Sequence, residues 1–260
     1  MTLPDFGIGA LEDQLWVLIF LMVRIGAALM AAPLFGARSV PVEVRIVIAG
    51  AVAVFVMNWL PVRLPADMLA IETILALLTE AVIGFTLGFV LQLSFAVPLI
   101  AAEQISGTMG MAMATAVDPN SGGQSGALGQ VFAIMLTLVF LALGGHLLWL
   151  RLVVESYNLF PPGADWNVGE RGWLVASFAS QALATAVAIA LPVTLVLLLV
   201  QIVTGVISRS APSLNLFALG LPAGVLAGLA ALIAAVPLLT EHFVMLAEAA
   251  IEQAGRAVQP

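Results

Sequence analysis

Several stretches of this chain stay apolar for longer than a lipid bilayer is thick. About 18 to 20 apolar residues in a helix cross the hydrocarbon core, and residues 66–105 and 173–208 both exceed that length. Hydrophobic residues make up 62% of the sequence and charged residues only 9%, whereas soluble domains carry about 25% charged residues. The sequence therefore predicts an all-α polytopic membrane protein. It excludes a cytoplasmic globular enzyme, a nucleic-acid binder and a disordered chain.

The charged residues further limit the partners and the targeting signals that this membrane protein can have. The 8 basic residues are all arginines against 15 acidic ones, which gives a net charge of -7. This balance, without a basic cluster, argues against nucleic acid or anionic lipid surfaces as partners. Acidic Asp5, Glu12 and Asp13 stand where a signal peptide needs positive charge, so we expect no removable signal. Arginines are spread over alternate loops in similar numbers, and the positive-inside rule predicts no orientation.

Six apolar segments are expected to be helical, with residues 240–260 as an amphipathic C-terminal tail. A 36-residue helix reaches roughly 54 Å at about 1.5 Å per residue, against an apolar thickness of about 30 Å. The long segments must therefore tilt, kink or break at Pro98 and Pro192, or extend beyond the bilayer within an assembly. The predicted segments are residues 15–32, 46–60, 66–105, 127–150, 173–208 and 214–239.

Small residues recur at four-residue spacing in two of these segments. Gly84 and Gly88 form a GxxxG pair, and Gly220, Gly224 and Gly228 form a double one. This spacing lets helix backbones approach closely. The contact partner is either another helix of the same chain or a neighbouring subunit, and the spacing alone favours neither.

Charged and strongly polar side chains inside the apolar segments are rare and suggest a function. Arg24 lies in the middle of the first segment, and Glu80 and Gln92 lie in the third. A charge at the bilayer centre costs at least about 2.5 to 3.5 kcal/mol on insertion scales. Arg24 and Glu80 therefore pair with each other, or face a hydrated interior or a partner subunit. An internal ion pair without a transport role is the plain alternative.

Catalytic and metal-binding patterns are absent from the sequence. There is no cysteine, and the two histidines, His146 and His242, do not form an HExxH motif or a cluster of three or four ligands. Ser106 and His146 lack the GxSxG-type elbow that a serine hydrolase would need. No phosphate-binding GxxxxGK[ST] loop occurs. The sequence predicts no enzyme activity, no metal and no cofactor.

The stretch of residues 106–126 is unusual because methionines alternate with small residues. Met109, Met111 and Met113 stand among glycines and alanines, and Asp118-Pro119 with Gly122-Gly123 follow. Thioether side chains fill irregular gaps, and glycine permits close backbone approach. The composition suits a deformable seal in a pore, or simply a flexible loop with apolar filler.

With these motifs the chain resembles the FliR family. Members of this family are membrane components of the flagellar type III export gate, and injectisomes carry a homologous subunit. The resemblance runs over essentially the whole length as a single domain, residues 1–260. It is densest in residues 101–104, 109–119, 140–147 and 209–222, and the first span with Arg24, Pro33 and the Val40-Pro41 pair before Arg45 also fits. Gly145 stands before His146 where asparagine is more usual.

The resemblance implies a helical hetero-oligomeric gate in the bacterial inner membrane, at the flagellum basal body. This chain would join FliP and FliQ in a channel for unfolded export substrates, which FlhA and FlhB hand on, with membrane lipid around it and no nucleic acid. It implies a channel plug made of Ser106, Gly107, Thr108, Met109, Gly110, Met111, Met113, Asp118, Pro119, Gly122 and Gly123. The polar residues assigned to assembly within the membrane are Arg24, Glu80, Gln92, Glu103, Gln104, His146 and Asn215.

Three alternatives stay open at the level of sequence. An injectisome subunit would share these features. A stand-alone secondary transporter or channel would be stable without heterologous partners and would move a small solute, although no internal repeat supports it. An intramembrane hydrolase would depend on Ser106 or His146.

Overall fold

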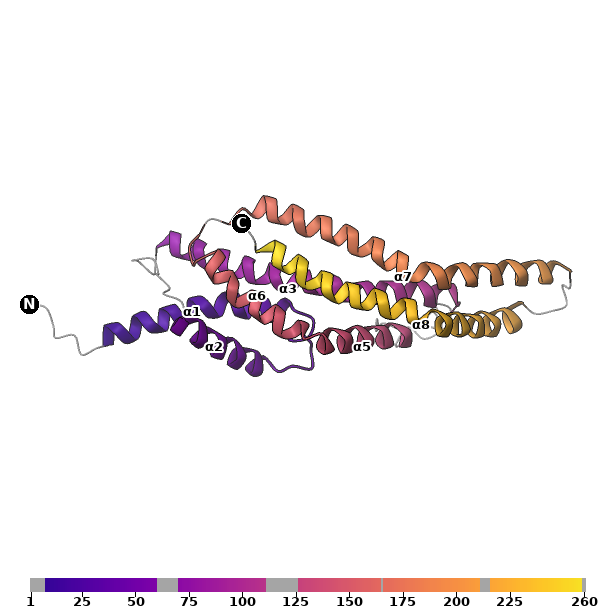
Figure 1. Ribbon diagram of the computed structural model, residues 1–260, viewed down its shortest axis with the longest axis horizontal. Coiled ribbons are helices and arrows are strands. Elements are labelled where there is room, and N and C mark those ends of the chain that lie inside the picture. Colours follow the sequence, from indigo (N-terminus) through magenta and orange to yellow (C-terminus); the bar gives the residue numbers. More distant parts are fainter. Residues whose placement is uncertain (1–7, 60–69, 111–125, 165, 211–215, 259–260) are drawn as a thin grey trace, which may run out of the picture. The chain divides into compact units, whose positions relative to one another are not determined.

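The computed structural model describes residues 8–59, 70–110, 126–164, 166–210 and 216–258, and within these ranges the regular structure is α-helical (Figure 1). The all-α prediction is confirmed. The helices are α1 (Ile8–Ala31), α2 (Val42–Trp59), α3 (Ile71–Thr108), α5 (Ala127–Ala142), α6 (Gly145–Leu159), α7 (Val168–Ser210) and α8 (Leu216–Ala257).

Five of the described helices, α1, α2, α3, α7 and α8, are long and apolar enough to cross a membrane. A sixth span results if α5 and α6 are counted together. The 43 residues of α7 extend about 64 Å at about 1.5 Å per residue, roughly twice the apolar thickness of a bilayer. Pro98 and Pro192 lie inside α3 and α7, and both helices continue on either side of the proline. Neither proline ends its helix.

Several helix ends differ from the predicted segments by a few residues, and two differences change how the chain divides into helices. The segment expected over residues 127–150 is divided, because Gly144 has a φ of 71°, a left-handed conformation that ends α5 and precedes α6. Residues 240–257, part of the stretch expected as an amphipathic tail, continue α8. Their buried positions, among them Phe243, Ala247, Ala250 and Ala254, recur at three- or four-residue spacing, so the same helical face remains covered.

The chain divides into two compact units, and α3, α7 and α8 contribute to both. Unit 1 comprises Met1–Leu93, Gly144–Phe178 and Ala249–Pro260, and its described core includes residues of α1, α2, the first part of α3, α6, the start of α7 and the end of α8. Trp149 of α6 is fully buried there; its indole N–H donates to the Leu87 carbonyl at 3.1 Å, and its ring stacks on Phe35 at 5.7 Å. The buried hydrogen bond thus joins α6 to α3, and the stacked rings join α6 to the connection between α1 and α2.

Unit 2 comprises Ser94–Leu143 and Ala179–Glu248. Edge-to-face aromatic pairs connect its helices: Phe95 with Phe140 at 5.4 Å, and Phe132 with Phe243 at 5.5 Å. These pairs join α5 to α3 and to α8.

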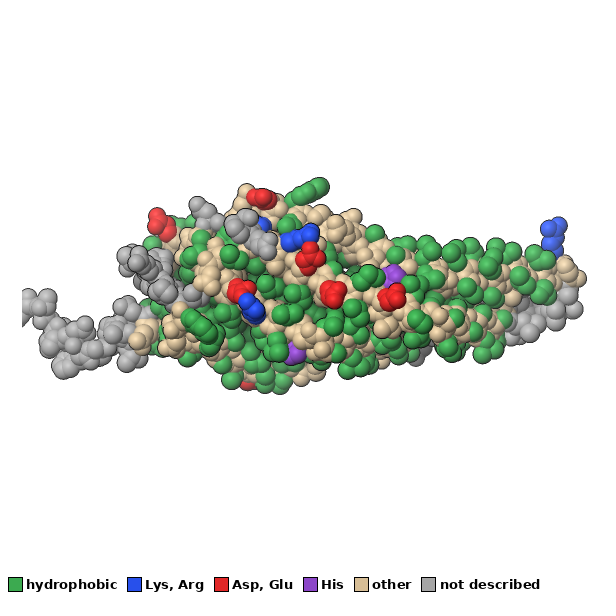
Figure 2. Space-filling model, viewed as in Figure 1, with side chains coloured by type: hydrophobic (Ala, Val, Ile, Leu, Met, Phe, Trp, Pro, Cys, Tyr) green, Lys and Arg blue, Asp and Glu red, His purple; other side chains and the backbone are tan. Residues whose placement is uncertain are grey.

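The outer surface of the described helices is largely apolar. Hydrophobic side chains cover most of the visible face, with few charged groups between them (Figure 2). Trp59, Trp173 and Ile233 are each more than 70% exposed. A water-soluble monomer rarely exposes contiguous apolar area on this scale, whereas lipid tails accept it. The surface and the spans together establish a polytopic membrane protein.

Candidate functional site

A buried ion pair joins two membrane-spanning helices in unit 1. Arg24 of α1 and Glu80 of α3 are both fully buried. Arg24 Nε donates to Glu80 Oε2 at 2.7 Å, and Nη2 donates to Oε1 at 2.8 Å. This bidentate geometry uses the planar fork of the guanidinium, which a lysine ammonium does not offer. Of the alternatives left open by the sequence, the structure shows pairing of these residues with each other.

Helix α6 completes the surroundings of Arg24. Arg24 Nη1 donates to Ser156 Oγ at 3.0 Å, and Nη2 also donates to the Phe160 carbonyl at 2.8 Å. The ring of Tyr157 lies 4.1 Å from the guanidinium carbon, and its hydroxyl donates to the Leu21 carbonyl at 2.7 Å. The charge is therefore met by a carboxylate, two neutral acceptors and an aromatic face.

The arrangement is buried among the helices and holds them together. Both charges are removed from solvent, and their polar atoms are occupied by α1, α3 and the end of α6. Breaking one buried pair by removing a partner typically costs about 3–5 kcal/mol. The geometry defines a structural centre that fixes α1 against α3 and α6.

Two glycines of α3 allow the close approach that the ion pair requires. A Cβ at Gly84 would overlap the carbonyl oxygen of Arg24, and one at Gly88 would lie 2.6 Å from the Ala31 Cβ. The atoms met at Gly84 belong to the α1 backbone, which cannot rotate away as a side chain can. The structure thus places this GxxxG pair within the chain, one and two helical turns from Glu80.

The first residues of the predicted plug lie in unit 2 and continue α3. Ser106, Gly107 and Thr108 are helical, and Met109 and Gly110 form a turn in which Gly110 has a φ of 85°. The expected loop therefore begins later than residue 106. Met111, Met113, Asp118, Pro119, Gly122 and Gly123 lie outside the described residues.

Both ends of this segment contact the helices of unit 2. Met109 is 3% exposed and lies against α8, where a Cβ at Gly224 would be 3.0 Å from the Met109 carbonyl and one at Gly228 would overlap its side chain. Gln201 of α7 donates to the Thr108 carbonyl at 2.7 Å. At the other end, the Gly126 amide donates to Glu103 Oε1 at 3.1 Å. The described residues on either side of 111–125 thus contact α7, α8 and α3.

The remaining residues that were predicted to act in assembly or helix packing lie at separate places along the chain. Gln92 and Gln104 are exposed. His146 is half-buried, and its Nδ1 has no hydrogen-bond partner within the described residues. Within the described part of the chain, a Cβ at Gly220 would meet no atom within 4 Å, unlike Gly224 and Gly228 of the same series. Asn215 lies outside the described residues. Among the described residues there is no group of three or more potential metal ligands.

Three residues that contact the ion pair or the start of the predicted plug were not predicted from the sequence. Ser156 and Tyr157 are uncharged residues beyond the predicted segment 127–150, and only folding brings them to Arg24. Gln201 is one polar residue in a very apolar helix, a signal comparable to that of Gln92. The sequence noted Arg45 but not its role: its Nη2 donates to the Ala37 and Val40 carbonyls at 2.7 and 2.9 Å and closes the α1–α2 connection.

The fold and the buried centre define a polytopic helical membrane protein stabilised by an internal ion pair. Residues 15–250 match the model of the family described as bacterial export proteins, family 1, and the chain belongs to that family. This match confirms the resemblance to FliR.

Curated relatives extend over most of the chain. It is 29% identical over 232 residues to the flagellar biosynthetic protein FliR of Pectobacterium carotovorum subsp. carotovorum, covering 87% of this chain and 88% of that protein. The FliR of Bacillus subtilis (strain 168) is 30% identical, covering 78% and 80%. The FliR of Escherichia coli (strain K12) is 28% identical, covering 84% and 83%.

The packing of Met109 on α8 leads to a testable prediction. Gly228→Val is expected to displace the Met109 side chain, because valine would occupy the space that its Sδ and Cε fill. Since a methionine that leaves its packing becomes accessible to peroxide, Met109 sulfoxide should form several-fold faster, as measured by peptide mass spectrometry. Gly220→Val, on the same helix but with no described atom within 4 Å of the added Cβ, should leave the rate unchanged. Equal rates in all three proteins would contradict this packing.

Proposed function

We propose that this chain is an integral subunit of the flagellar protein export gate in the bacterial inner membrane. In this proposal it forms with FliP and FliQ the channel through which unfolded flagellar proteins pass, and FlhA and FlhB hand substrates to it. The observation that carries the proposal is the family match over residues 15–250, together with relatives named flagellar biosynthetic protein FliR. The chain itself catalyses no chemistry in this role.

The length of the helices supports the proposed role independently of the family match. The three longest helices, α3, α7 and α8, contain 38, 43 and 42 residues. Each is longer than about 20 residues, the length that crosses a bilayer. A helix of this length tilts strongly or extends beyond the hydrocarbon, and an assembly with other helical subunits offers apolar surface for the excess.

Residues 106–126 are proposed as the plug of this channel. The contacts of Met109 with α8 and of Gly126 with Glu103 support a segment that is held at both ends. The intervening methionines and glycines suit a seal that yields to a passing chain. In this role the polar residues Glu103 and Gln201 hold the segment rather than react.

The function is tested by native mass spectrometry of the tagged chain, gently extracted from its own host. The proposal expects one copy of this chain with several copies of smaller membrane subunits. A chain that appears only as a monomer or homo-oligomer, while remaining folded, would overturn the gate assignment and favour a stand-alone transporter.

Deletion of residues 107–123 tests the plug. The shortened chain is expected to assemble and to make the membrane leaky to ions and small solutes, because the seal is missing while the helices remain. The measurement is solute uptake or membrane depolarisation in cells, with assembly checked by native mass spectrometry. Normal assembly with an unchanged leak would contradict the plug role.

A further inference from the structure

The connection between α6 and α7, in unit 1, folds back on itself. Gly163 has a φ of 82°, and the Ala164 amide donates to the Pro161 carbonyl at 2.9 Å, so the chain makes a tight turn in which glycine takes the left-handed position. Beyond this turn Trp166 returns to Phe160, and their rings meet edge to face at 4.9 Å. Both residues are buried. Because aromatic pairs in this geometry attract each other, the connection has a small core of its own.

Arg171, in the first turn of α7, covers this aromatic pair. Its guanidinium carbon lies 5.6 Å from the centre of the Phe160 ring and 5.5 Å from the centre of the Trp166 ring. A cation within about 6 Å of an aromatic face is attracted by the ring electrons, and here two rings share one cation. The Arg171 side chain thus holds both rings against the start of α7.

Phe160 links this cluster to the buried ion pair. Its ring lies against Arg171, whereas its carbonyl accepts a hydrogen bond from Arg24 Nη2 at 2.8 Å. Its amide donates to the Ser156 carbonyl at 2.9 Å, and the Ser156 hydroxyl accepts from Arg24 Nη1 at 3.0 Å. Two of the hydrogen bonds that hold the Arg24 guanidinium therefore depend on the position of Phe160 and of the end of α6.

The same arginine also reaches the end of α8. Arg171 Nη1 donates to the Arg256 carbonyl at 3.3 Å. This carbonyl lies in the last turn of α8, where carbonyl groups have no partner within the helix and attract positive charge. Ala254, Ala257 and Val258 are almost fully buried, so the end of α8 is packed into unit 1. Arg171 therefore joins the α6–α7 connection to the end of α8.

We propose that Arg171 is a positioning residue for the buried Arg24–Glu80 pair and that it acts through Phe160. The Arg171 guanidinium fixes the Phe160 ring, and the fixed ring places the Phe160 carbonyl where Arg24 can donate to it. The α6–α7 connection is then a structural element that links the end of α8 to α1, and not a passive linker. This inference concerns unit 1 alone and does not rest on the export role.

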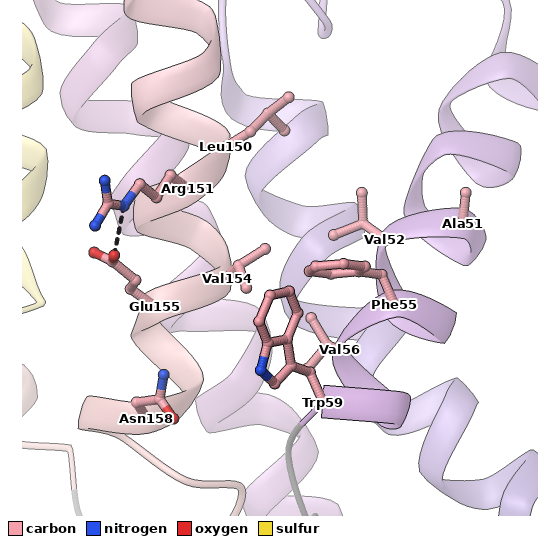
Figure 3. Close-up of a pocket in the computed structure, with 10 residues that line it drawn as sticks. All are labelled: Ala51, Val52, Phe55, Val56, Trp59, Leu150, Arg151, Val154, Glu155 and Asn158. Carbon is pink, nitrogen blue, oxygen red and sulfur yellow. Dashed lines mark hydrogen bonds and ion pairs between the residues drawn. The ribbon is translucent and has the colours of Figure 1, made fainter.

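The first test compares Arg171→Met with Arg151→Met in the purified full chain in detergent. Methionine keeps much of the apolar stem of arginine and removes the charge. Arg151 is the matched control, because it is an exposed arginine of the same unit whose side chain extends from α6 away from α2 and pairs with Glu155 at 2.6 Å (Figure 3). Arg171→Met should lower the thermal midpoint by a few degrees, whereas Arg151→Met should change it little.

A measurement at Arg24 distinguishes positioning from a local contact. All 8 basic residues are arginines, so nuclear magnetic resonance of arginine labelled with ¹⁵N at Nε gives few signals, and the signal lost in Arg24→Leu identifies Arg24. Its buried Nε–H should exchange slowly with deuterium. Arg171→Met should speed this exchange several-fold, and Arg171→Lys, which returns a cation to the rings, should restore part of the protection. Phe160→Leu, which removes the ring and keeps the carbonyl, should act like Arg171→Met.

A double-mutant cycle completes the test. Within the part of the chain that the structure describes, no hydrogen bond or ion pair joins Arg171 to Arg24 or Glu80, so independent contributions should add. If Arg171 acts on the pair, Arg171→Met should lower the thermal midpoint less in a chain that carries Arg24→Leu with Glu80→Leu. Additive losses would overturn the proposal, as would unchanged exchange of the Arg24 Nε–H in Arg171→Met or a midpoint equal to that of Arg151→Met.

Discussion

Glu80→Ala is expected to destabilise the chain more than any other single substitution of a charged residue in its described part. It would leave the Arg24 guanidinium fully buried between α1, α3 and α6 with its main partner removed. Losing one partner of a buried pair typically costs about 3–5 kcal/mol, a large fraction of the stability of most proteins. We expect a much lower thermal midpoint in detergent and a low yield of any complex with partner subunits. Arg24→Ala should act in the same direction.

The double variant Arg24→Leu with Glu80→Leu distinguishes the effect of an unpaired buried charge from the effect of altered side-chain packing. Removing both charges removes the burial penalty together with the attraction, so much of the lost stability should return. The recovery should be incomplete, because the Phe160 carbonyl loses its donor, and an unsatisfied buried acceptor costs about 1–3 kcal/mol. Glu252→Gln, in an exposed pair, should change little. A Glu80→Ala chain as stable and as well assembled as the unmodified one would contradict the structural role of the pair.

The sequence predicts the charged members of this centre but not the rest. Arg24 and Glu80 stand out because a charge in an apolar segment needs a partner, whatever the fold. Ser156 and the Phe160 carbonyl carry no such signal, since serines and carbonyls are common and only the approach of α6 selects these two. A rare charged residue in an apolar segment can be singled out from the sequence, whereas the uncharged groups around it are selected only by how the helices pack.

Spacing predicted the close approach of helices but not which glycines take part. Gly84 and Gly228 both lie in GxxxG patterns, yet the first meets the backbone of α1 and the second a methionine side chain. Gly220 has the same spacing and meets nothing within 4 Å. The helix ends were also partly missed, because the left-handed conformation of Gly144 depends on the turn and not on composition.

Gly84→Ala is expected to have the second large effect. The added methyl group would overlap the Arg24 carbonyl oxygen and crowd the Ala27 Cβ at 3.1 Å, so α1 must move away from α3. Overpacking of a tight contact typically costs about 1–3 kcal/mol. The movement also stretches the Arg24–Glu80 bonds, which lie one helical turn away. The thermal midpoint and the yield of assembled complex should both fall.

Two comparisons show whether the ion pair carries part of this loss. Gly26→Ala in α1 adds the same methyl group where no atom lies within 4 Å, and it should be neutral or stabilising, because alanine favours a helix over glycine by about 1 kcal/mol. In a Glu80→Ala background, Gly84→Ala should cost less than in the unmodified chain, since the pair is already lost and residues in contact are not additive. Equal costs in both backgrounds would mean that the glycine contact acts independently of the buried charges. A Gly84→Ala chain that matches Gly26→Ala in stability would contradict the close packing of α1 on α3.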